Sequence, residues 1–280
     1  MKGKTLFFIL IALSTFGNPA LAGDGDSANG GFFSAEHWKL RAGLTAFQVE
    51  DSVTFGIGFG AKGNYTTAGG TRLELLATAI VEDDRDELDS DHIPVWFKSR
   101  FRAEKQIAAI TPAWLVDATL DLDHKMNTVS SIEQSATLMP GIKFGFHTRR
   151  LELFAKFGAG GYYLEIDDDL PEEYADYRRG DLSNSEFALS QEYKVELALN
   201  DVLSFSYRYK DFRDTDWELL ESRKKIKFTY TADPRRKFVL DIEKTHYNLD
   251  QFSRSAGDNG LAVLPFKEDT YYQAYLEFDF

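Results

Sequence analysis

Apolar and polar residues alternate along most of this chain, and the alternation is clearest in its last nine residues, Tyr272 to Phe280. Every even-numbered position there is apolar, and three odd-numbered positions, Gln273, Glu277 and Asp279, are polar. Side chains of a β-strand point to opposite faces in turn. The pattern therefore predicts a strand with one face toward an apolar phase and the other toward water.

The same period of two recurs through the preceding sequence, interrupted by turn-forming residues. One face of each segment is apolar, and the other carries charged, hydroxyl or glycine residues. Pro140 falls inside one segment, and because proline cannot donate to a strand ladder we expect a local bulge there. Residues 105–110 and 124–127 are expected to be connections. The pattern predicts twelve strands, near residues 37–50, 53–62, 72–81, 95–103, 114–122, 132–146, 151–163, 186–196, 203–210, 223–230, 238–243 and 272–280.

The last predicted strand resembles the C-terminal assembly signal of Gram-negative outer-membrane β-barrels. The residues that carry this resemblance are Tyr272, Leu276, Phe278 and Phe280. The resemblance implies a barrel located in the bacterial outer membrane. It also implies outer-membrane lipid and lipopolysaccharide as surroundings, and recognition by the barrel assembly machinery through the C-terminal strand.

The connections between the predicted strands differ in length in a regular way. Those before odd-numbered strands are short, whereas the three longest, near residues 82–92, 167–183 and 249–267, precede even-numbered strands. An even strand count, short periplasmic turns and longer extracellular loops are typical of bacterial barrels. The sequence therefore predicts an all-β fold, a single closed antiparallel transmembrane β-barrel of twelve strands. The alternative is a soluble all-β sandwich or barrel, which would bury one sheet face without charges.

The amino-terminal residues predict export of the chain. Lys2 and Lys4 precede an apolar run at residues 6–13, and Ala20-Leu21-Ala22 has the small-residue pattern of a cleavage site. The apolar run is shorter than the roughly 20 residues that a membrane-spanning helix needs. We therefore expect a signal peptide at residues 1–22, a flexible periplasmic leader at 23–36 and the barrel at 37–280.

The composition agrees with an exported barrel and argues against one class of partner. The chain has a formal net charge of −13, no cysteine, 13 tyrosines and 23 phenylalanines. A nucleic-acid-binding protein would usually be basic, so we expect no nucleic-acid partner. The abundance of aromatic residues suits the two aromatic girdles of an outer-membrane barrel.

Basic residues gather on the predicted inner face of three strands. Because two of these strands should lie opposite the third in a closed barrel, the basic residues would favour an anionic or hydroxylated solute between them. The alternative is that they pair with inner carboxylates, such as those of Asp121, Glu192 and Glu243, and fill the lumen. The predicted pore-lining residues are Lys98, Arg100, Arg102, Arg208, Lys210, Arg223, Lys225 and Lys227.

The sequence favours a channel over an enzyme. A hydrolase needs a nucleophile, a base and an orienting group within hydrogen-bond reach. His246 has Thr245, Asn248 and Asp250 nearby in sequence but falls on the outward phase of its strand, and His92 lies in an acidic loop. We therefore predict no catalytic residues and no cofactor. A closed structural or adhesive barrel and an outer-membrane lipid hydrolase remain as alternatives.

The acidic loop near residues 82–92 has two interpretations. Its carboxylates could bind divalent cations, or they could be solvated loop charges. Their spacing does not match a calcium-binding loop. We therefore predict no metal site.

Within the class of outer-membrane barrels, the chain resembles the small KdgM-type porins. The strand count, the basic inner face and the stretch Ser204-Phe205-Ser206-Tyr207-Arg208-Tyr209-Lys210 carry this resemblance. It implies a porin-like channel for small hydrophilic, acidic or sugar-like solutes, with Arg208 as a lumen contact. The acidic residues on the inner face depart from a purely basic lumen.

Overall fold

The structure, a computed structural model, describes residues 34–49, 52–82, 95–126, 132–166, 185–248 and 268–279. The chain divides into two compact units, residues 1–33 and 34–280, and every described residue belongs to the second unit. The predicted signal peptide, most of the predicted leader and the aromatic residue Phe280 lie outside the described residues. A short 3₁₀ helix, η1 (Ala35–His37), precedes the first strand.

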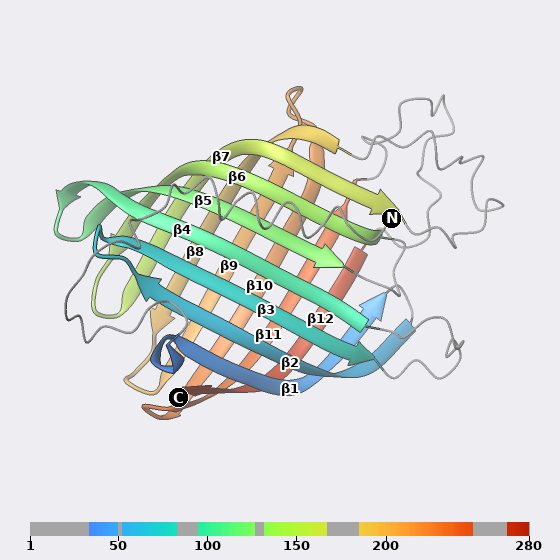
Figure 1. Ribbon diagram of the computed structural model, residues 1–280, viewed down its shortest axis with the longest axis horizontal. Helices are drawn as coiled ribbons and strands as arrows, with labels where there is room; N and C mark the ends of the chain where they lie inside the picture. Colours follow the sequence, from blue (N-terminus) through green and yellow to red (C-terminus); the bar gives the residue numbers. More distant parts are fainter. Residues whose placement is uncertain are drawn as a thin grey trace, which may run out of the picture. The chain divides into compact units, whose positions relative to one another are not determined.

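Twelve antiparallel strands form a closed barrel, which confirms the predicted fold (Figure 1). Each strand pairs with its neighbours in the sequence, and β1 pairs with β12 to close the ring. The strands are β1 (Trp38–Val49), β2 (Ser52–Thr66), β3 (Thr71–Glu82), β4 (Val95–Thr111), β5 (Trp114–Met126), β6 (Ile132–His147), β7 (Leu151–Ile166), β8 (Ser185–Ala198), β9 (Leu203–Arg213), β10 (Leu219–Asp233), β11 (Arg236–Tyr247) and β12 (Glu268–Asp279).

The two ends of the barrel differ in their connections. At the end where β1 begins and β12 ends, two to four residues join successive strands, as at 112–113 and 199–202. We call this the short-turn end. The opposite end, which we call the long-connection end, includes the stretches 83–94, 167–184 and 248–267 between strands. This distribution agrees with the one predicted from the sequence.

The outer face of the barrel is apolar and the inner face is polar. Large apolar side chains point outward along the strands and are exposed, with Phe55 at 65% and Phe59 at 58% of their full accessible surface. Tyr272, Leu276 and Phe278 of the C-terminal strand belong to this outer face. An exposed apolar surface of this extent is expected where lipid replaces water. Among the described residues, no helix is long and apolar enough to cross a bilayer.

Strands β4 and β5 are longer than the sequence pattern predicted. Residues 105–110, expected to form a connection, continue β4 to Thr111, and β5 continues through His124 to Met126. The prediction of a connection at 105–110 was wrong because this stretch contains no glycine, proline or asparagine to end the strand. The turn forms instead at residues 112–113, where Thr111 Oγ1 accepts hydrogen bonds from the backbone amides of Ala113 and Trp114 at 3.3 and 3.1 Å.

The bulge expected at Pro140 is absent from the described ladder between β6 and β7. The register there is unchanged, since Leu138 pairs with Gly161 and Gly141 pairs with Gly158. Glycine on β7 explains this tolerance. A Cβ atom at Gly160 would lie 2.0 Å from the Leu138 carbonyl oxygen. The two backbones therefore approach more closely than side chains would allow, and the strand accommodates proline without a shift in register.

Candidate functional site in the barrel lumen

All eight basic residues singled out in the sequence lie on the inner face of the barrel. They form two groups, on β4 and on the β9–β10 pair, which occupy facing walls of the closed ring. The sequence predicted this placement from strand alternation. It did not predict which carboxylate each basic residue would contact. Those contacts determine the charge of the lumen and the width of any path through it.

Several ion pairs cross the lumen from one wall to the other. Lys98 on β4 lies 3.1 Å from Glu243 on β11, measured between Nζ and Oε1. Asp123 on β5 accepts from Lys210 Nζ on β9 at 2.6 Å and lies 3.7 Å from Arg223 on β10. Because these strands are far apart around the ring, each pair spans the interior and narrows any axial path.

A second network links β4 and β5 to β7, β8 and β9 at mid-height. Arg102 donates to Asp121 at 2.6 Å, and Lys156 lies 2.5 Å from Asp121 and 2.8 Å from Glu192. Arg208 lies 2.7 Å from Glu192 on the other side. Asp121 and Glu192 are almost completely buried. Buried carboxylates need such partners, because an unpaired buried charge is strongly destabilising.

The remaining basic residues differ in their pairing. Arg100 lies 3.0 Å from Glu74, and Lys225 lies 3.0 Å from Asp241. Arg223 is paired with the buried Glu221 on its own strand. Lys227, in contrast, makes no ion pair with any described residue. Seven of the eight predicted residues therefore have a carboxylate partner within ion-pair distance, and Lys227 has none among the described residues.

Near the long-connection end the lumen contains what we call the aromatic layer, formed by Phe47, Ile80, Trp96 and Tyr271. These inward side chains are at most 2% exposed. The rings of Phe47 and Trp96 stack with centroids 4.4 Å apart, and Tyr271 meets each of them edge-on at 4.9 Å. All four residues lie near the ends of their strands at this side of the barrel.

Lys125 lies inside the lumen beside the aromatic layer. Its Nζ is paired with Asp269 of β12 and donates a hydrogen bond to the Tyr247 hydroxyl at 2.9 Å. The same nitrogen lies 5.3 Å from the centroid of Trp96 and 5.0 Å from that of Tyr271, within cation–π range. One cation thus joins β5 to β4, β11 and β12 across the lumen.

A second buried group lies on the opposite wall, on strands β6 to β11. Within it the Tyr162 hydroxyl donates to Glu221 at 2.5 Å. The group combines apolar and aromatic residues that point inward from strands whose inner face is otherwise polar. Its members are Ile132, Met139, Tyr162, Leu164, Ala188, Phe212, Leu220 and Tyr247.

The described residues suggest no catalytic arrangement. His246 lies 3.4 Å from Glu268 on the outer face, away from the lumen. His92 and the acidic loop lie outside the described residues. Among the described residues there is no group of three or more side chains suited to hold a metal ion.

Comparison with known proteins places this fold. No protein-family model matches the chain, and no curated protein matches its sequence. Among solved structures, the NanC porin in a rhombohedral crystal form superimposes with a TM-score of 0.52 at 11% identity, covering 87% of this chain and 100% of that chain. The fold resembles that of the NanC porin.

Two further structures are similar with lower scores. The KdgM porin in complex with disordered oligogalacturonate has a TM-score of 0.47 at 10% identity, covering 86% of this chain and 99% of that chain. Outer membrane phospholipase A from Escherichia coli has a TM-score of 0.43 at 9% identity, covering 85% and 92%. At these identities the similarity concerns the fold alone.

Proposed function

We propose that this chain is an outer-membrane channel that admits small hydrophilic solutes through a narrow, charge-balanced lumen. The closed ring and its apolar outer face support a location in a membrane, because every backbone group of a closed barrel can be satisfied without water. The similarity in fold to a porin supports the same proposal.

The observation that carries the proposal is that several basic side chains on the inner wall remain partly exposed. The side chain of Arg72, at the short-turn end, is 53% exposed, and that of Lys225, near mid-height, is 27% exposed. Lys98 is 20% exposed, and Lys125, beside the aromatic layer, is 9% exposed. Partly exposed side chains such as Lys225 and Lys98 are consistent with a hydrated path along this part of the wall. Lys156 at mid-height is only 4% exposed, so the path narrows at the mid-height network and again to a constriction at Lys125 and the aromatic layer.

The ion pairs determine the selectivity that we expect. A row of basic residues attracts anions when no carboxylates pair with them. Here seven of the eight predicted residues have carboxylate partners. We therefore propose weak anion preference and passage of small neutral or sugar-like solutes rather than strong selection for acidic ones. Solutes must pass the constriction by displacing side chains such as that of Lys98.

The test is single-channel conductance of refolded protein in a planar bilayer, with the reversal potential measured in a salt gradient. We expect small unitary steps and a reversal potential near zero, shifted slightly toward anion preference. Neutralising Arg100, Arg208 and Arg223 together should move the reversal potential toward cations. A neutral substitution of Lys244, which lies on the outer face, is the matched control and should change neither property.

A closed structural barrel is the second candidate, and the burial of the aromatic layer favours it specifically. In that case the cross-lumen pairs would serve rigidity alone, as in a protein core. The wild-type protein would then show no conductance at any voltage or salt concentration, and only variants that break the constriction would conduct.

The cellular setting belongs to the same proposal. We propose that residues 1–22 direct export, and that the C-terminal strand, through Tyr272, Leu276, Phe278 and Phe280, presents the chain to the barrel assembly machinery. Outer-membrane lipid and lipopolysaccharide would surround the apolar outer face. Loss of outer-membrane insertion on substituting Phe278 and Phe280 with serine, with normal export, would support this role.

A further inference from the structure

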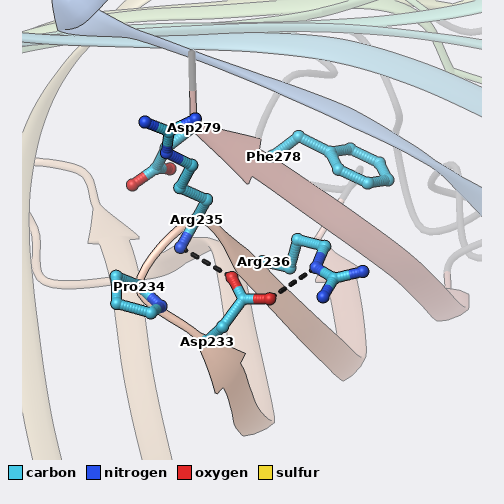
Figure 2. A pocket seen from close by; sticks show the side chains of 6 residues that line it. All are labelled: Asp233, Pro234, Arg235, Arg236, Phe278 and Asp279. Carbon is cyan, nitrogen blue, oxygen red and sulfur yellow. Dashed lines mark hydrogen bonds and ion pairs between the residues drawn. The ribbon is translucent and has the colours of Figure 1, made fainter.

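A recess of about 550 Å³ opens at the short-turn end, between the β10–β11 turn and the end of β12 (Figure 2). It lies away from the lumen residues described above, beside the last outward residues of the C-terminal strand. Charged and apolar side chains both line it: Asp233, Pro234, Arg235, Arg236, Phe278 and Asp279.

Hydrogen bonds fix the backbone and one guanidinium of this recess. The Asp233 carboxylate accepts from the Arg235 backbone amide at 2.9 Å and from Arg236 Nε at 2.5 Å. The Asp279 amide donates to the Arg235 carbonyl at 2.9 Å, which ties the turn to the end of β12.

Both carboxylates of the recess are already paired, which leaves positive charge available to a ligand. Asp279 is already paired with Lys39 at 2.7 Å, and Asp233 is paired with Arg236. Arg235 makes no ion pair with a described residue, and the Arg236 side chain is 64% exposed. Since Asp233 holds Arg236 through Nε, the two terminal nitrogens of that guanidinium remain available for a planar, bidentate acceptor such as a phosphate.

Apolar groups adjoin these guanidiniums on the outer face. Phe278 lines the recess, and Tyr230 and Phe238 are exposed outward on the neighbouring strands. The recess therefore lies at the edge of the apolar band, where lipid headgroups meet the barrel. A ligand that fits must carry an anionic phosphate for the arginines and an apolar portion for Phe278.

We propose that this recess binds the phosphate headgroup of an anionic phospholipid from the membrane leaflet at the short-turn end. The proposal rests on the membrane location proposed above, but not on conduction through the lumen. A soluble phosphate would satisfy the arginines but would not use Phe278. The apolar wall and the position at the edge of the band are what favour a lipid.

The test is native mass spectrometry of the delipidated, refolded barrel titrated with phosphatidylglycerol or, separately, with phosphatidylcholine. We expect phosphatidylglycerol to bind about tenfold more tightly, a difference of roughly 1.4 kcal/mol. The double variant Arg235→Ala with Arg236→Ala should abolish this preference, and Phe278→Ala should weaken binding of both lipids. Retention of the folded, heat-modifiable band on electrophoresis shows that each variant is still a barrel.

The β6–β7 turn provides a matched control. It also carries two adjacent exposed arginines at the short-turn end, Arg149 and Arg150, but neither lines the recess described here. Replacing both with alanine should leave the lipid preference unchanged. Equal loss in the two double variants would mean that general positive charge, and not this recess, attracts the lipid.

Other results would also overturn the proposal. Equal binding of the two lipids would exclude recognition of the headgroup. Full competition by millimolar inorganic phosphate would identify a site for a free anion. Lipid binding and conductance are independent measurements. A barrel that conducts but binds no phosphatidylglycerol refutes only this inference, and one that binds it but never conducts refutes only the proposed channel.

Discussion

Lys98 on β4 and Glu243 on β11 meet inside the barrel, with Nζ of the lysine 3.1 Å from Oε1 of the glutamate. The two residues are 145 positions apart in the sequence and belong to facing walls. The lysine nitrogen also lies 3.3 Å from the ring centroid of Tyr271. This pair lies beside the aromatic layer, so in the proposed channel it would control how far solutes advance.

Replacing Lys98 with alanine should raise the unitary conductance. The substitution removes a long side chain from the narrowing path, while Glu243 keeps Lys225 as a partner at 3.2 Å. The barrel should therefore remain folded. Single-channel recording checks this outcome, with Lys244→Ala on the outer face as the control. An unchanged conductance in Lys98→Ala would show that solutes do not pass this pair.

Replacing Lys125 with methionine should destabilise the barrel by about 3–5 kcal/mol, because Asp269 would be left buried without its cation. Adding Asp269→Asn should recover much of this loss, since the double variant buries no isolated charge. Urea unfolding in lipid vesicles, followed by tryptophan fluorescence, measures both effects. Equal stability of the single and double variants would contradict the ion pair described here.

Strand alternation predicted the barrel, its strand count and the inward direction of the basic residues. It could not predict the ion pairs, because partners such as Lys98 and Glu243 depend on the register accumulated around the whole ring. A change of one residue in any hairpin would alter which side chains share a level. The sequence alone therefore left open whether the basic residues of the inner face attract anions or are paired with carboxylates.

The aromatic layer could have been recognised in part. Trp96 falls on the inward phase of β4, beside the basic residues, so strand alternation alone points its side chain into the lumen. Phe47, Ile80 and Tyr271 also occupy inward positions in otherwise polar faces. The sequence signal for this layer was an apolar residue at an inward-pointing position near the end of a strand. The sequence could not show that these side chains contact one another, because that depends on the register of the strands around the ring.

Lys227 and Arg102 should respond differently to removal of their charge. Lys227→Met removes a cation without a partner among the described residues, so stability should hold or improve, while the reversal potential shifts toward cations. Arg102→Met deprives the buried Asp121 of its contact at 2.6 Å and should cost about 1–3 kcal/mol. The free energy of unfolding and the reversal potential, measured on both variants, test these two expectations. A larger stability loss for Lys227→Met would be the contrary result.

The outer face should not tolerate charge. Phe59 lies at the middle of β2 and points outward. Phe59→Arg should destabilise the barrel in lipid vesicles by about 2–4 kcal/mol, the cost expected for arginine at the bilayer midplane. Phe59→Leu is the matched control and should stay close to wild type. If both variants were equally stable in vesicles, this face would not contact lipid.

The most direct test of the proposed channel is the single-channel conductance of the wild-type protein beside that of Lys125→Ala with Asp269→Ala. The account predicts small, weakly selective steps for the wild type and larger steps once the constriction at Lys125 is removed. Silence of the wild type at all voltages and salt concentrations, with conduction only in the double variant, would contradict a channel and identify a closed structural barrel.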